Sequence, residues 1–93
     1  MNLKQLKEKY KDSKPDSILE RGLLLTVKVQ KINDLYEIIL EDETGTLEAS
    51  TVNANVLRTL KKKTQTGEPV TIKGYLAKTE YEDLGIGIEE IIE

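Results

Sequence analysis

The sequence predicts an all-β fold in which five strands are accompanied by two helices. Three observations lead to this prediction: several segments alternate apolar and polar residues, turn-forming residues separate them, and two further segments repeat apolar residues at helical spacing. The chain has 93 residues, enough for one small hydrophobic core and too few for two independent folding units. We therefore expect a single compact domain.

The first expected strand comprises residues 23–32, in which apolar residues at every second position define an inner face. Asn33 and Asp34 favour a tight turn after this strand. A second strand at residues 35–41 then returns beside the first, with Tyr36 on its inner face. These segments predict an antiparallel pair with one buried and one exposed side.

A second hairpin is predicted around a glycine-containing turn at residues 42–45. Gly45 adopts left-handed backbone conformations readily, and the Asp42 carboxylate is able to accept backbone N–H groups within the turn. Residues 46–51 alternate again and supply the third strand. The first three strands are thus expected to form a meander.

Two helices are predicted from apolar residues spaced three or four positions apart. The first comprises residues 3–11, and Pro15 ends its pattern. Residues 16–20 are expected to add one more helical turn. The second helix comprises residues 53–63, with Asn53 as its N-cap and three lysines at its C-terminal end, where cations are favourable.

A last hairpin completes the expected fold. Residues 70–81 alternate as a long strand, and Gly74 interrupts the alternation in the manner of a bulge or a barrel bend. Residues 82–85 form a turn, and residues 86–92 form the fifth strand.

The order of these elements is that of the OB-fold, a five-stranded Greek-key barrel with a helix between its third and fourth strands. Three segments resemble OB-fold nucleic-acid-binding domains of the replication protein A and tRNA-anticodon-binding type. They are residues 40–47 (LEDETGTL), 69–76 (PVTIKGYL) and 87–92 (GIEEII). The resemblance covers residues 22–92.

This resemblance implies a division of the chain into an N-terminal amphipathic helix and linker at residues 1–21 and an OB-fold barrel at residues 22–93. It also implies a ligand groove across the second and third strands, flanked by the loops between strands one and two and between strands four and five. Because OB-folds bind nucleic acids, oligosaccharides and proteins on the same frame, the resemblance predicts the fold more firmly than the ligand.

Composition excludes several kinds of chemistry. The chain has no cysteine and no histidine, so a thiolate zinc site and the usual general bases are absent. It also lacks a phosphate-cradling glycine loop, and we expect a protein that is not an enzyme and uses no cofactor or metal. No apolar run reaches the length of a bilayer span or a signal peptide, so the protein is expected to be cytoplasmic, with no membrane partner.

The charge pattern restricts where nucleic acid could bind. The formal net charge is −3, whereas nucleic-acid-binding domains are usually basic, so binding requires a local patch. The lysines are unevenly distributed, since five of them fall within the first 14 residues. Three carboxylates are expected on the outer face of the second and third strands, where they repel phosphate: Glu37, Glu41 and Glu48.

Single-stranded nucleic acid needs cations for its phosphates and flat rings for its bases. Because the first and fourth strands pair in an OB barrel, lysines and tyrosines on these two strands are the predicted contacts. They are Lys28, Lys31, Lys73, Tyr75, Lys78 and Tyr81. The three lysines at residues 61–63 are instead explained by a helix end that faces water.

Two functional hypotheses remain open at this point. In the first, the chain is a non-catalytic module that binds single-stranded DNA or RNA, as in replication. In the second, it is a protein-interaction subunit of a replication-type complex, which contacts its partner through the N-terminal helix or an exposed edge strand. The acidic composition and the amphipathic spacing of Leu3, Leu6 and Tyr10 favour the second.

Overall fold

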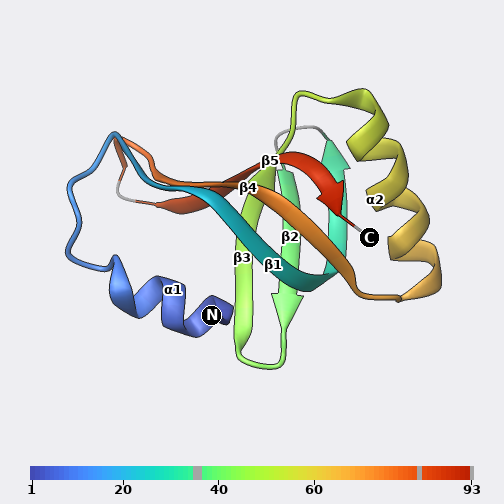
Figure 1. Ribbon diagram of the computed structural model, residues 1–93, viewed down its shortest axis with the longest axis horizontal. Coiled ribbons are helices and arrows are strands. Elements are labelled where there is room, and N and C mark those ends of the chain that lie inside the picture. Colours follow the sequence, from blue (N-terminus) through green and yellow to red (C-terminus); the bar gives the residue numbers. More distant parts are fainter. Residues whose placement is uncertain (35–36, 82, 93) are drawn as a thin grey trace.

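The computed structural model describes residues 1–34, 37–81 and 83–92, so the predicted inner position of Tyr36 lies outside the described residues. These residues form five strands and two helices (Figure 1). In chain order the elements are α1 (Leu3–Lys9), β1 (Ser17–Asp34), β2 (Glu37–Asp42), β3 (Gly45–Ser50), α2 (Ala54–Thr66), β4 (Val70–Lys78) and β5 (Leu84–Ile92). The predicted all-β class and element order are confirmed.

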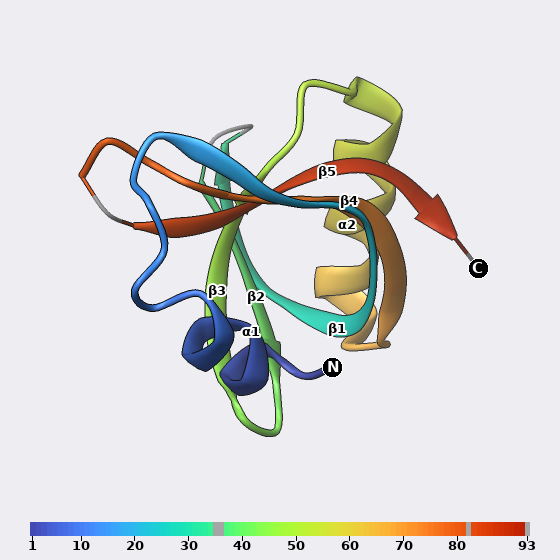
Figure 2. The same cartoon turned by 60° about the vertical axis from the view of Figure 1, so that its left-hand side comes forward.

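The five strands form one sheet that closes on itself in the order β1-β2-β3-β5-β4. β1 closes the ring because its first part pairs with β4, from Ser17 to Val27, and its last part pairs with β2, from Lys28 to Asp34. β3 and β5 are parallel, and all other neighbours are antiparallel. The two helices lie on opposite sides of the strands (Figure 1, Figure 2).

The alternation read from the sequence correctly assigns the inner face of the strands. The buried residues of β2 and β4 are even-numbered and those of β1 and β3 are odd-numbered, because successive side chains of a strand point to opposite faces. α2 adds apolar side chains from its own inner face, and its N-cap Asn53 accepts hydrogen bonds from the backbone N–H groups of Asn55 and Val56, as predicted. The shared core contains Leu25, Val27, Ile38, Leu40, Leu47, Val56, Leu60, Ile72, Leu76 and Ile86.

The start of β1 differs from the prediction. Residues 16–20 were expected to be helical, but Ser17 and Ile18 pair with Lys78 and Ala77 of β4. The prediction was wrong because the free backbone groups of β4 offer this segment a ladder of hydrogen bonds, which overrides a weak local preference for helix. β1 consequently begins at Ser17 and pairs with β4 from its first residue.

The predicted bulge at Gly74 is confirmed by a shift of register between β4 and β5 at this residue. A Cβ atom placed on Gly74 would overlap the carbonyl oxygen of Gly87 and lie 3.2 Å from the Cα of Ile88. The space beside Gly87 is in turn filled by the ring of Tyr75. The two strands therefore approach too closely at this point for any side chain at residue 74.

Candidate functional site

Helix α1 is part of the hydrophobic core. Leu3 and Leu6 have no exposed surface and belong to the same buried cluster as the strands. Fully burying a leucine stabilises a fold by about 1.5–3 kcal/mol relative to leaving it exposed. The apolar face of α1 is thus buried within the chain. This burial holds the lysines on the other faces of α1 beside the sheet.

The turn between β2 and β3 fixes the N-terminal end of α1. Asp42 Oδ1 accepts the backbone N–H of Thr44 at 2.7 Å, as the sequence predicts for this turn. Its other oxygen, Oδ2, accepts the N–H of Leu3 at 2.9 Å, while Thr44 Oγ1 accepts the N–H of Lys4 at 3.1 Å. The first backbone N–H groups of a helix have no partner within it, so the turn satisfies two of them.

Asp42 makes this attachment dependent on pH. Desolvation alone would raise the pKa of its carboxyl, but hydrogen bonds from Thr44, Leu3 and Gly45 outweigh that effect and hold the pKa below its usual value of 3.8. A group with a lowered pKa stabilises the fold above its unfolded pKa, and this stabilisation is lost as the pH falls through the folded pKa. The contribution of Asp42 is therefore present at neutral pH and disappears in acid.

We expect Asp42→Ala to lower the free energy of unfolding by about 1 kcal/mol at pH 7, the usual effect of losing an acceptor at a helix N-terminus. Urea denaturation at pH 7 and at pH 3 measures this difference, which should shrink at the lower pH. Glu43→Ala removes an exposed carboxylate from the same turn and serves as the control. A difference of equal size at both pH values would refute the role assigned to the Asp42 carboxylate.

The segment that follows α1 is held by Lys78. This side chain is only 5% exposed, and its ammonium group donates hydrogen bonds of 3.0 Å to the carbonyl oxygens of Lys11 and Ser13. Tyr10 adds a hydrogen bond of 2.8 Å from its hydroxyl to Glu20. Lys78, predicted to contact phosphate, is therefore turned toward the chain that follows α1.

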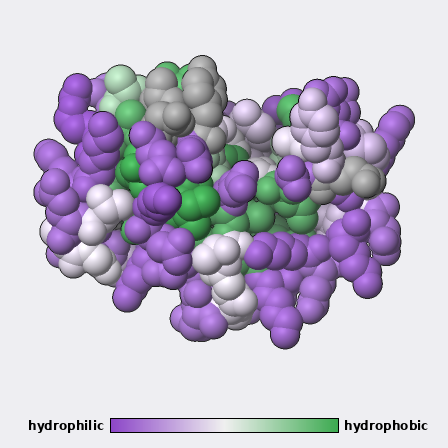
Figure 3. Space-filling view, turned by 180° about the vertical axis from the view of Figure 1, so that it is seen from behind, coloured by the Kyte–Doolittle hydropathy of each residue, from purple (hydrophilic) through white to green (hydrophobic). Residues whose placement is uncertain are grey.

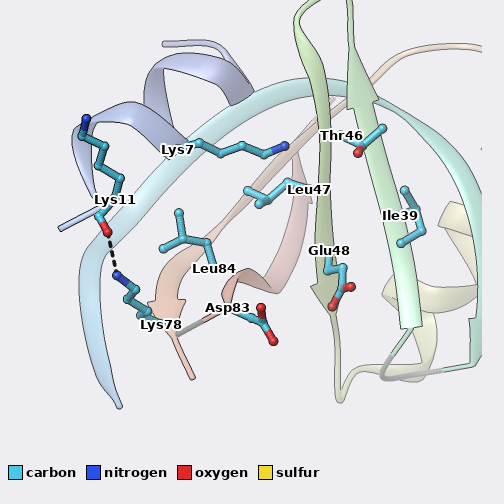
Figure 4. A pocket seen from close by; sticks show the side chains of 9 residues that line it. All are labelled: Lys7, Lys11, Ile39, Thr46, Leu47, Glu48, Lys78, Asp83 and Leu84. Atoms are coloured by element: carbon cyan, nitrogen blue, oxygen red, sulfur yellow. Dashed lines mark hydrogen bonds between the residues drawn. The ribbon is translucent and has the colours of Figure 1, made fainter. Parts of the chain in front are cut away.

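Between α1 and the sheet lies a groove with a volume of about 520 Å³. In Figure 4, Lys7 reaches from α1 toward β3, whereas Glu48 projects from β3 itself and Asp83 lies in the turn before β5. Three apolar side chains supply the floor. We call this site the α1 groove, and its lining residues are Lys7, Lys11, Ile39, Thr46, Leu47, Glu48, Lys78, Asp83 and Leu84.

The charge of the α1 groove differs from that of four other cavities formed by described residues. Its lining holds three lysines and two carboxylates. The linings of the others hold more carboxylates than cations. In a chain of net charge −3, the α1 groove is thus the one of these five in which carboxylates do not outnumber lysines, and one of its lysines, Lys78, is engaged by backbone carbonyls.

The structure separates the lysines that the sequence assigned to one patch. Lys73 faces Leu24 across the β1–β4 ladder, and Lys28 lies beyond the last pair of that ladder. The four positions between Leu24 and Lys28 correspond to about 13 Å along the strand. Lys73 also lies 4.0 Å from Glu90, and Lys28 is paired in register with Glu41.

The other predicted contacts are also dispersed. Lys31 is exposed on β1, near the far end of that strand from α1. Tyr81 is 80% exposed in the turn between β4 and β5. Tyr75 is half-buried, with its ring against Gly87, and lines a cavity that adjoins the α1 groove through their shared residues Glu48, Asp83 and Leu84.

The carboxylates expected on the outer face of the sheet limit the surface that could bind phosphate. Glu37 and Glu48 are exposed and Glu41 is half-buried, with the Glu41 carboxylate accepting a hydrogen bond from Gln30 at 3.1 Å. Figure 3 shows that hydrophilic side chains cover most of the face opposite to that of Figure 1, with apolar residues in a band across its middle. Apolar surface is therefore accessible there, framed by polar side chains.

Sequence reasoning did not assign Lys7 and Lys11 to the site, although the cluster of lysines in the first 14 residues was the signal for them. Their position depends on the burial of Leu3 and Leu6 against the sheet. The predicted groove across β2 and β3 is partly recovered, since Ile39, Thr46, Leu47 and Glu48 line the α1 groove.

In the part of the chain that the structure describes, no group of three or more acidic residues is placed to hold a metal ion. Neither helix there has the length and apolar character needed to cross a membrane. Neither a known protein family nor a curated protein matches the chain. A proposal for function must therefore come from the geometry of the α1 groove.

Proposed function

We propose that the chain is a non-catalytic OB-fold module that binds single-stranded DNA or RNA in the α1 groove. The observation that carries this proposal is the lysine-rich lining of the groove, in which Lys7 reaches from α1 toward β3 and Lys11 lies in the segment that follows α1 (Figure 4). The strand order β1-β2-β3-β5-β4, with α2 between β3 and β4, supports an OB-fold assignment, and OB-folds commonly bind oligonucleotides on the corresponding strands.

The proposed roles follow from what each wall of the groove offers. Lys7 and Lys11 neutralise phosphates, while Lys78 holds the backbone beside them. Ile39 and Leu84 provide an apolar floor on which the faces of bases rest. Two lysines and a short apolar floor predict weak binding, with a Kd in the micromolar range or above, since each neutralised phosphate and each stacked base adds little by itself.

We expect Lys7→Ala/Lys11→Ala to abolish most of this binding. Fluorescence anisotropy with labelled ten-nucleotide DNA and RNA at two salt concentrations measures it. For single strands the logarithm of the association constant changes with the logarithm of salt concentration by about −0.7 for each neutralised phosphate, so the slope should become shallower by about 1.4 in the double variant. The matched control is Lys61→Ala/Lys62→Ala, which removes two exposed charges at the end of α2.

Neither lysine at residue 7 or 11 is part of the core, so the double variant should keep the thermal stability of the original chain. Equal loss of binding in the control pair would show that only net charge matters. Absence of binding by the original chain to both DNA and RNA at low salt would contradict the proposed function.

A protein partner is the second candidate. It is favoured by Val52 and Leu24, which are apolar yet 90% and 59% exposed. The leucines of α1 do not supply this contact, because both are fully buried. A partner that engages α1 would therefore meet its lysines.

A further inference from the structure

Two lysines of the α1 groove and its two carboxylates come from different segments of the chain. Lys7 and Lys11 belong to α1 and the residues after it, whereas Glu48 belongs to β3 and Asp83 to the turn before β5 (Figure 4). Both carboxylate side chains are exposed and so remain accessible to a bound molecule. A polyanion that enters the groove must therefore keep its phosphates on the α1 side.

The wall formed by Glu48 and Asp83 continues into a second cavity of about 220 Å³. Gly85 and Gly87 lie on its floor, and Tyr75 contributes an aromatic ring there. The ring of Tyr75 already fills the space beside Gly87, so the open part of this cavity lies over Gly85, which has no side chain. The base side of a bound strand is thus expected on this wall and its phosphate side on α1.

A carboxylate distinguishes bases by their hydrogen-bonding edges. It accepts hydrogen bonds from the exocyclic amino group of cytosine, while the uracil oxygen at the same position is itself an acceptor and is repelled. Uracil retains an N–H donor at N3 but flanks it with two acceptor oxygens, so Glu48 and Asp83 favour a base that presents an exocyclic amino group. The two pyrimidines are the same size, so the difference arises from the edge alone.

We propose that Glu48 and Asp83 make the groove selective for single strands rich in cytosine over those rich in uracil. This inference rests on the proposed function. It assigns to the two carboxylates, which repel phosphate, the role of accepting hydrogen bonds from bases. Adenine and guanine, which also carry exocyclic amino groups, are accepted for the same reason.

The test compares ten-nucleotide oligodeoxycytidine with oligodeoxyuridine by fluorescence anisotropy at pH 7.5 and low salt. The original chain should bind the cytidine strand about tenfold more tightly, within the range for one or two specific base contacts. Glu48→Gln/Asp83→Asn should reduce this ratio to about twofold, with binding of the uridine strand unchanged or stronger because the repulsion is gone. Glu43→Gln, in the turn between β2 and β3, removes the same kind of charge outside this wall and should preserve the ratio.

The outcomes separate the two proposals. Equal affinity of the original chain for both strands overturns the inference and leaves the proposed function intact. A ratio that survives in Glu48→Gln/Asp83→Asn also overturns it. Failure of the original chain to bind either strand overturns the proposed function and the inference together.

Discussion

Gly74→Ala should lower the free energy of unfolding by about 3 kcal/mol, at the upper end of what overpacking usually costs. The added Cβ would overlap the carbonyl oxygen of Gly87 and come within 3.0 Å of its carbonyl carbon. These atoms belong to the backbone of β5, which has no freedom to rotate away as a side chain would. Part of the β4–β5 ladder must therefore separate.

The matched control for this substitution is Gly85→Ala on β5. A Cβ at residue 85 meets only the Glu48 carbonyl oxygen, at an ordinary distance of 3.7 Å, so a change within about 0.5 kcal/mol is expected. Urea denaturation followed by circular dichroism measures both variants. Similar stabilities for the two would show that β4 and β5 do not approach as described.

Leu6→Ala should destabilise the chain by about 3 kcal/mol, because truncating a fully buried leucine usually costs 2–5 kcal/mol. Leu6 has no exposed surface, and its loss leaves a cavity between α1 and the strands. Since α1 forms one wall of the α1 groove, affinity for oligonucleotides should fall with it. Thermal denaturation and fluorescence anisotropy measure the two effects.

Leu24→Ala applies the same chemical change to a leucine that is 59% exposed on β1. It should alter the free energy of unfolding by no more than about 0.5 kcal/mol. If Leu6→Ala proved equally mild, α1 would not be packed in the core, and the lysines it carries would not form a fixed wall.

Much of the fold was predictable because the strands are amphipathic. The alternation in β1 to β4 reports which side is buried, and Asn53 and the turn at Asp42 use local hydrogen bonds that sequence reveals directly. The start of β1 was not predictable, since Ser17 and Ile18 are strand residues only because β4 is beside them. The local sequence does not indicate that pairing.

The site was less predictable because it joins segments far apart in the chain. Lys7 comes beside Glu48 and Asp83 only after Leu3 and Leu6 have entered the core. Strand pairing placed Lys28 and Lys73 on neighbouring strands as expected, but the register, which sequence does not give, separates them. Burial of Lys78 likewise depends on where the residues after α1 pass.

Titration of the ¹⁵N-labelled chain with an unlabelled ten-nucleotide strand, followed by amide chemical shifts, tests directly whether the groove beside α1 receives a single strand of nucleic acid. We expect the largest shifts at Lys7, Lys11, Thr46, Glu48 and Leu84, on three walls of the α1 groove. Shifts confined to Lys28, Lys73 and Glu90, or none at saturating strand, would contradict the account.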